Sequence, residues 1–226
     1  MINKLFLSGG GDIDVSYDFD ELFFCSLPLK ASILYIPVAM ATTMIKKEAC
    51  FDWFSKLIFH HSINDRNIDF SMWNNENDLP NLYNYDAVYI GGGNTYRLLS
   101  ILEKTGILNA IKEYIYNGGI YYGGSAGAII IGRNLLTVGE ENLENYASHI
   151  GMNLIRDISI FPHFSNSEEQ NDRIKNISKI NNLRIVALPE DSGLIIDSKN
   201  VSIYGSVYLY EQEKKTFFHT SGENIK

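Results

Sequence analysis

The sequence is poor in cysteine, in proline and in long apolar runs. Its 226 residues include two cysteines, Cys25 and Cys50, and five prolines. The cysteines lack metal-ligand spacing and give no basis for a disulfide framework, so we expect free thiols in a reducing compartment. No run approaches the roughly 18 apolar residues of a membrane-spanning helix, and Met1–Leu7 is too short for a secretory signal. We therefore expect a cytoplasmic protein without a membrane partner.

Excess positive charge is also absent. Lys and Arg number 19 against 27 Asp and Glu, and the formal net charge is −8. A nucleic-acid surface needs clustered Lys and Arg, so we expect no nucleic-acid partner. The chain is 45% hydrophobic and can bury a core. Its length fits one α/β domain, since such folds often reach about 200–250 residues, and we expect a single domain over residues 1–226, as a monomer or homodimer.

Short β-rich runs alternate with stretches of helical spacing. This alternation is typical of βαβ units and of a mainly parallel sheet. The last runs are separated by short gaps, which predicts antiparallel strands near the C-terminus, at an edge of the sheet. The predicted strands are 4–7, 31–37, 87–90, 119–122, 158–161, 184–188, 193–197 and 206–210, and the predicted helices are 43–60, 95–102 and 107–116.

A G-x-S-x-G pentapeptide lies between a predicted strand and an apolar run. Residues 123–127 read Gly-Gly-Ser-Ala-Gly, and Ala128–Ile131 follow. At such a strand-to-helix turn the serine is held in a strained conformation with its hydroxyl at the top of the sheet, and free N–H groups of the helix face any oxyanion formed there. The pattern predicts Ser125 as a nucleophile. The alternative is a glycine-rich turn whose serine caps the helix.

A hydrolytic serine also needs N–H donors for the tetrahedral oxyanion. The loop Gly91–Thr95 follows a predicted strand, as the serine does, and ligands bind beyond the carboxyl ends of parallel strands. We expect Gly92 or Gly93 to supply one donor and Ala126, the residue after the serine, to supply the other. A phosphate-binding role for the glycine loop is disfavoured, because the loop lacks the lysine and the glycine spacing of phosphate motifs.

The serine further needs a base and a carboxylate that orients the base. His163 is the preferred base because it directly follows a predicted apolar strand. The segment 138–144, between the serine and His163, contains three glutamates and can supply the acid, although a polar loop of this kind is usually just solvated. The other histidines are His60, His61, His149 and His219, of which His219 lies where an α/β-hydrolase would place its base.

Three blocks in this order resemble the signatures of the dipeptidase E/cyanophycinase family of serine peptidases. They are Ile-Gly-Gly-Gly-Asn-Thr at 90–95, Gly-Ser-Ala-Gly-Ala at 124–128 and Pro-His-Phe-Ser-Asn at 162–166. The resemblance implies a flavodoxin-like, class I glutamine-amidotransferase-like α/β fold with helices on both faces of the sheet. It also implies Ser125 as nucleophile, His163 as base and Glu140 as the acid, with Glu141 as the neighbouring alternative.

The resemblance implies a serine dipeptidase or exopeptidase that cleaves short peptides through a Ser-His-Glu triad. No metal or organic cofactor is expected. Asn94 and Thr95 of the glycine loop are expected substrate contacts, and Arg173 matches a position that could hold a substrate aspartate. The main alternative is a non-hydrolytic module on the same fold that binds a small metabolite. An amidotransferase is disfavoured, because such enzymes use a cysteine at the elbow.

Overall fold

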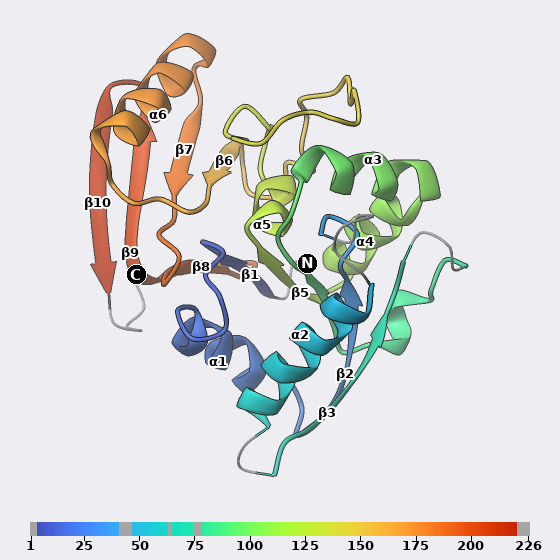
Figure 1. Cartoon of the computed structure of the whole chain (residues 1–226). Coiled ribbons are helices and arrows are strands. Elements are labelled where there is room, and N and C mark those ends of the chain that lie inside the picture. The colour runs from blue at the N-terminus through green and yellow to red at the C-terminus, as the bar shows by residue number, and fades with distance from the viewer. Residues whose placement is uncertain (1–3, 41–46, 63–64, 75–77, 221–226) are drawn as a thin grey trace.

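The computed structural model describes residues 4–40, 47–62, 65–74 and 78–220. Within these ranges ten strands form one mixed sheet in the order β3-β2-β4-β5-β1-β8-β9-β7-β6, and β10 pairs with β9 (Figure 1). The strands are β1 (Lys4–Ser8), β2 (Lys30–Ile36), β3 (Asn67–Met72), β4 (Ala87–Ile90), β5 (Ile120–Gly124), β6 (Ile158–Phe161), β7 (Arg184–Ala187), β8 (Gly193–Ile196), β9 (Val201–Glu211) and β10 (Lys214–Thr220).

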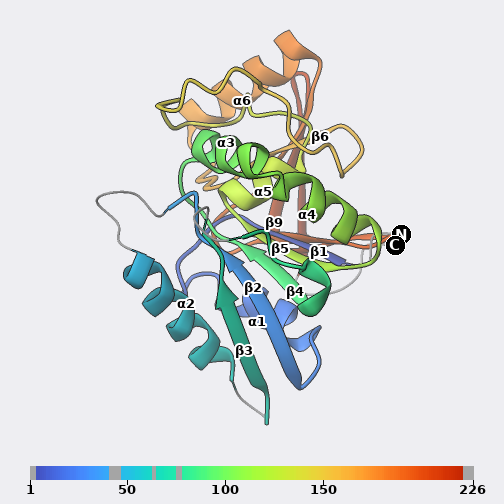
Figure 2. The same cartoon turned by 90° about the vertical axis from the view of Figure 1, so that its right-hand side faces the viewer.

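Helices cover both faces of the parallel half of this sheet. Figures 1 and 2 show α1 and α2 on one face and α3, α4 and α5 on the other. A short 3-10 helix, η1, precedes β4, and α6 packs against β7 and β9. The helices are α1 (Tyr17–Cys25), α2 (Lys47–His61), η1 (Leu82–Asn84), α3 (Thr95–Thr105), α4 (Ile107–Tyr116), α5 (Ala126–Ile131) and α6 (Glu168–Asn181).

Alternate residues of the central strands feed two different cores. Val88 and Ile90 of β4 pack with α3, α4 and α5, whereas Ala87 and Tyr89 of the same strand belong to an aromatic core under α1 and α2. Successive side chains of a strand point to opposite faces of the sheet, so both sets are buried when helices cover both faces. All four residues of β4 are buried for this reason.

The fold class predicted from the sequence is confirmed, and α4 has the predicted bounds. The antiparallel strands near the C-terminus are also present, but β8 pairs with β1 in the interior of the sheet rather than at an edge. The sequence pattern did not predict α1, β3, α6 or β10. The predicted start of the second helix at residues 43–46 lies outside the described residues, and α2 is seen from Lys47.

Helix α6 shows why a helix with few buried residues is not predicted from hydrophobic periodicity. Ile174 and Ser178 are its buried residues, and the helix contacts only β7 and β9 of the sheet among its main partners. A helix that buries so little has no wide apolar stripe to detect. None of the helices in the described ranges is long and apolar enough to span a bilayer.

Candidate active site

Ser125 lies at the turn between β5 and α5 in a strained backbone conformation. Its φ is 49° and its ψ is −107°, outside the regions that L-residues favour. Two glycines of the pentapeptide make this turn possible. A Cβ on Gly123 would lie 2.5 Å from the carbonyl oxygen of Gly127, and one on Gly127 would lie 2.4 Å from that of Ile90. Only glycine fits either position, so the pentapeptide encodes the close packing of strand, turn and helix.

His163 contacts Ser125 directly. Its Nε2 is 2.8 Å from Ser125 Oγ. The histidine follows β6, has a φ of 52°, and its backbone N–H donates to the carbonyl of Gly9 at 2.9 Å. This bond ties the loop after β6 to the turn after β1, and it places the imidazole over the serine. The side chain is about half exposed, at 48%.

The carboxylate on the far side of the imidazole belongs to Glu190. Its Oε1 is 2.8 Å from His163 Nδ1. Glu190 follows β7, which pairs in parallel with β6, so the turns after these two strands lie side by side. The prediction that Glu140 or Glu141 reaches the imidazole is therefore wrong. Glu190 follows the predicted strand 184–188, and the rule that strand ends converge could have found it.

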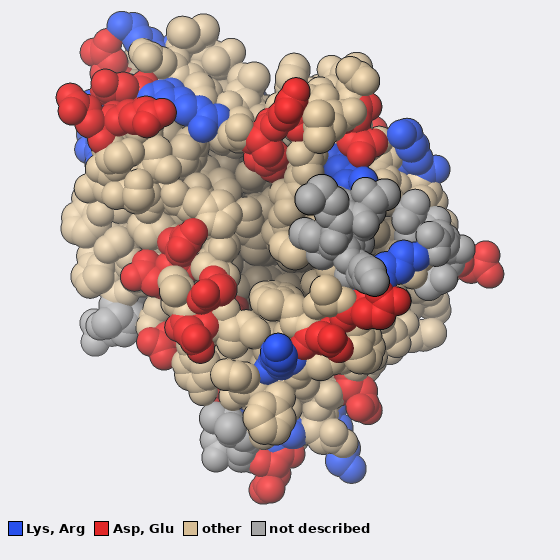
Figure 3. Space-filling model, in the orientation of Figure 1, with Lys and Arg blue, Asp and Glu red and all other residues tan. Residues whose placement is uncertain are grey.

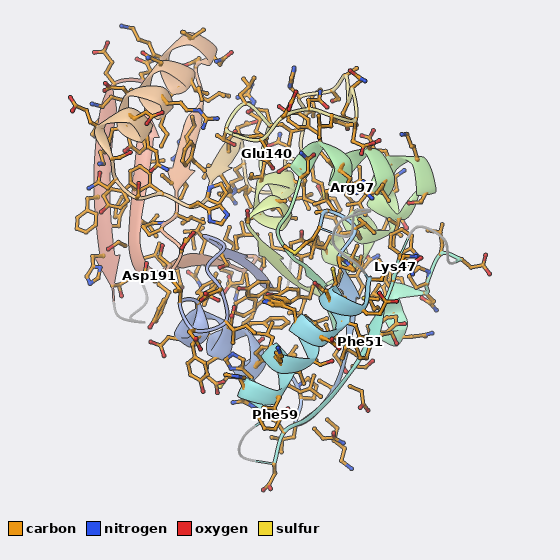
Figure 4. The ribbon with its side chains drawn as sticks, in the orientation of Figure 1. Lys47, Phe51, Phe59, Arg97, Glu140 and Asp191 are labelled. Carbon is orange, nitrogen blue, oxygen red and sulfur yellow. The ribbon has the colours of Figure 1, made fainter. Side chains whose placement is uncertain are left out.

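Glu140 makes its hydrogen bonds at the start of α3 instead of at His163. Its Oε1 accepts from the backbone N–H of Thr95 at 3.0 Å and from Thr95 Oγ1 at 2.6 Å. Its Oε2 accepts from the N–H of Gly139. A carboxylate at a helix N-terminus is stabilised by the free N–H groups there, and Figure 4 shows Glu140 beside the start of α3. Glu141 lies next to it and accepts from Asn94 Nδ2 through its backbone carbonyl.

The residues predicted to bind substrate are engaged within the protein. Asn94 caps α3 by accepting from the N–H of Arg97, and Thr95 is fully buried. The guanidinium of Arg173 donates to the carbonyls of Thr137 at 3.2 Å and Val138 at 2.6 Å. These side chains hold the loop 137–145 to its surroundings, and none of the three lines the cavity described below.

Gly10 is a site residue that the sequence reading missed. Its φ is +94°, and a Cβ on it would lie 2.7 Å from Ser125 Cβ and 2.8 Å from His163 Cε1. The backbone of the turn after β1 thus passes directly against the serine and the imidazole. Its position after a predicted strand was the signal that could have revealed it.

The expected oxyanion donors surround the serine unequally. Gly92 lies against it, since a Cβ there would be 3.3 Å from Ser125 Cβ. A Cβ on Gly93 would instead point away from Ser125 and lie 2.5 Å from the carbonyl oxygen of Ala39. Ala126 is the first residue of α5, where the N–H has no acceptor within the helix.

A cavity of about 270 Å³ opens beside Ser125, in the hollowed part of the face that Figure 3 shows. The loops 10–12 and 91–93 line it, together with the aromatic side chains of Tyr35, Trp53, Tyr89 and Tyr122. Tyr35, Tyr89 and Tyr122 lie in register on β2, β4 and β5, so their rings form a row across the floor. Within the described part of the chain, no three His, Cys, Asp or Glu side chains gather as a metal site would require.

A buried carboxyl lies behind this floor. Asp20 is 1% exposed, and burial raises its pKa to about 7 even though Tyr122 and Ser16 donate to it. The Ser16 bond measures 2.7 Å. Burial also raises the pKa values of Tyr89 and Tyr122 far above the ordinary value. The tyrosines therefore remain neutral hydrogen-bonding groups.

Comparison with known proteins identifies the family. The model of peptidase family S51 matches residues 5–204. The chain belongs to peptidase family S51. The predicted resemblance is thereby confirmed.

The individual relatives share only about a fifth to a third of their aligned residues with this chain. The chain is 29% identical to a peptidase E of a Nostoc species over 147 residues, which is 60% of each chain. It is 31% identical to a peptidase E of Haemophilus influenzae over 128 residues, or 53% of this chain and 54% of that one. Each alignment thus covers less than two thirds of the relative. The crystal structure of a peptidase from an acI-B1 actinobacterium superposes with a TM-score of 0.70, at 20% identity, over 100% of this chain and 97% of the other, and shows the same fold.

Proposed function

We propose that this S51 chain is a serine dipeptidase or exopeptidase that cleaves short peptides through a Ser125–His163–Glu190 triad. The observation that supports it most is the continuous pair of 2.8 Å contacts from Ser125 Oγ to His163 Nε2 and from His163 Nδ1 to Glu190 Oε1. This is the arrangement that a serine nucleophile, its base and an orienting carboxylate require. The small size of the cavity favours short substrates over folded proteins.

In this mechanism Glu190 accepts from Nδ1–H of His163 and fixes the tautomer whose Nε2 can take the hydroxyl proton. Ser125 Oγ attacks the scissile carbonyl as His163 takes its proton. The oxyanion lies between the glycine loop, with Gly92 or Gly93 as donor, and the free N–H of Ala126. His163 then gives the proton to the leaving amine. Water repeats the sequence on the acyl-enzyme and releases the acid and free serine.

The strained turn supports the same proposal. The φ of 49° at Ser125 holds the hydroxyl out from the sheet at the start of α5. Backbone strain of this kind costs free energy and persists only where the surrounding structure holds it in place, and such residues cluster at active sites. Packing by Gly10, Gly123 and Gly127 provides that support.

Ser125→Ala tests the proposal most directly. We expect kcat on short peptides to fall by on the order of 10³-fold or more, because the nucleophile is lost. An unchanged far-ultraviolet circular dichroism spectrum and unfolding midpoint would show that the fold persists. A fluorophosphonate probe should label the unaltered protein at Ser125 and leave the variant unlabelled. Turnover by the variant at the unaltered rate would disprove the nucleophile assignment, and failure to label Ser125 would favour a metabolite-binding module.

A further inference from the structure

The loop that carries His163 is held by a side chain from outside the triad. Gln170, in the first turn of α6, donates through its Nε2 to the backbone carbonyl of His163 at 3.1 Å. Its Oε1 accepts from the backbone N–H of Ser165 at 2.7 Å and from the hydroxyl of the same serine at 3.0 Å. The amide therefore bridges the chain on both sides of Phe164, in the loop that runs from β6 to α6 (Figure 1).

The sequence pattern of this segment favours a different role for Gln170. Residues 167–170 read Ser-Glu-Glu-Gln, the pattern of a helix capping box, in which the glutamine side chain accepts from the N–H of the capping serine. Ser167 does cap α6, because its side chain accepts from the N–H of Gln170 at 3.3 Å. The side chain of Gln170 instead reaches back past the cap to Ser165. Helix capping therefore does not account for this side chain.

All four polar groups of His163 have partners, and Gln170 supplies one of them. The ring nitrogens contact Ser125 and Glu190. The backbone N–H donates to the carbonyl of Gly9, and the backbone carbonyl accepts from Gln170. Gly9 contributes its backbone alone. Within the described part of the chain, Gln170 is therefore the side chain outside the triad that bonds to the base.

The backbone conformation of His163 requires an anchor of this kind. Its φ of 52° lies in the left-handed region, which a residue with a Cβ keeps only where the surrounding structure holds it. The imidazole leaves the chain at the same Cα, so a return to an extended conformation would carry the ring away from Ser125. The side chain is about half exposed, and packing alone does not enclose it. The bond from Gln170 to the carbonyl of the strained residue opposes that rotation.

We infer, resting on the proposed peptidase function, that Gln170 is a positioning residue whose amide holds His163 in the conformation that brings Nε2 to Ser125 Oγ. The donor half of the amide acts on the base, because Nε2 bonds to His163 itself. The acceptor half bonds to Ser165 and keeps the amide in its orientation. Gln170 does not line the cavity beside Ser125, so loss of the donor should lower kcat and leave KM nearly unchanged.

Gln170→Glu tests the donor, because it keeps an acceptor for Ser165 and places a carboxylate oxygen against the carbonyl of His163. We expect kcat on a short peptide to fall by on the order of 10- to 100-fold, with KM changed by less than about threefold. Gln170→Met has a similar length without either polar group and should lose at least as much. Steady-state kinetics measures both constants. A kcat within about twofold of the unaltered value in both variants, or a change in KM alone, would overturn the inference.

Asn171→Ala is the matched control in the same turn of α6. Asn171 donates to the carbonyls of Asn166 at 3.1 Å and Ser167 at 2.7 Å, so it holds the same loop without a bond to His163. Its removal should lower the free energy of unfolding at least as much as Gln170→Glu, yet leave kcat within about threefold. Equal losses of kcat in the two variants would show that loosening of the loop alone explains the effect, and would contradict the inference.

Nitrogen-15 NMR of the imidazole separates this inference from the peptidase function. At pH 8 the His163 ring of the unaltered protein should show a protonated Nδ1 and an unprotonated Nε2, because Glu190 accepts from Nδ1. Gln170→Glu should replace this single tautomer by a mixture, and Asn171→Ala should keep it. If the unaltered protein cleaves no peptide, the proposed function fails, and the spectrum still decides the positioning role. An unchanged His163 spectrum in folded Gln170→Glu protein would overturn the inference in either case.

Discussion

Glu190 and Glu140 are both hydrogen-bonded carboxylates, but they contact different parts of the molecule. Glu190 follows β7 and contacts the imidazole of His163 at 2.8 Å. Glu140 lies in the loop after α5 and contacts the start of α3 through Thr95. Glu140 is closer to Ser125 along the chain, yet the carboxylate bonded to the base is Glu190. Pairing of strands, rather than distance in sequence, decides which carboxylate reaches the base.

A third carboxyl differs from both in its burial. Glu190 is 52% exposed, whereas Asp20 is enclosed behind Tyr122. Burial disfavours the ionised form and raises the pKa of Asp20 to about 7. We expect replacements of these three carboxyl groups to differ in effect, from the largest at Glu190 to the smallest at Glu140.

Replacing the carboxylate at His163 should have the largest effect. We expect Glu190→Gln to lower kcat by about 10³-fold with little change in KM, because the amide no longer fixes the tautomer or stabilises the imidazolium. Steady-state kinetics on a short peptide measures this. The matched control is Glu140→Gln, which should retain most of its kcat. A Glu190→Gln protein within threefold of the unaltered rate, or a larger loss in the control, would reverse the assignment.

Asp20 should make stability depend on pH. Its pKa rises from the ordinary 3.8 to about 7 in the native state. The native protein therefore keeps a proton that the unfolded chain has released, and the contribution of Asp20 to stability is present at low pH and is lost as pH rises from about 4 to 7. That loss amounts to about 4 kcal/mol in all.

Asn at this position cannot titrate, so Asp20→Asn isolates the effect. The free energy of unfolding of the variant, minus that of the unaltered protein, should rise by about 4 kcal/mol between pH 4 and pH 8. Urea unfolding at several pH values measures the difference, with exposed Asp14→Asn as the control. A difference that stays constant across this range would show that Asp20 does not hold its proton in the native state.

Glu140 should have the smallest effect, and mainly on stability. Glu140→Ala removes the acceptor of the buried Thr95 hydroxyl and of the α3 N-terminus, and should lower the free energy of unfolding by about 1 kcal/mol. Glu141→Ala is the matched control, since Asn94 contacts its backbone carbonyl and not its side chain. Equal unfolding midpoints for the two variants, measured in urea, would argue that the Glu140 side chain does not stabilise the start of α3.

Most of the parallel half of the fold is predictable from local pattern. The runs around Leu34, Val88 and Tyr121 are apolar because their strands are buried on both faces. Elements that bury little, such as α6, have no such pattern. The partner of β1 on its other side, β8, also cannot be found from the sequence, because strand pairing over a long separation leaves no local signal.

The site divides in the same way. The serine and its glycines form a local motif, and their identity follows from the close contacts of one turn. The order of the three family blocks pointed to His163. Glu190, Gly10 and the tyrosine row each lack a motif of their own. They reach Ser125 because parallel strands bring their ends to one edge of the sheet.

The sequence by itself determined the α/β class, the elbow at Ser125 and the membership in a serine peptidase family, because these depend on periodicity and on residues close together in the chain. Only the tertiary structure decided which carboxylate contacts His163, and that three tyrosines form the floor of the cavity with a buried aspartate behind it. Both depend on the register between strands far apart in sequence. Register is set by the packing of the whole sheet, and so by no single segment.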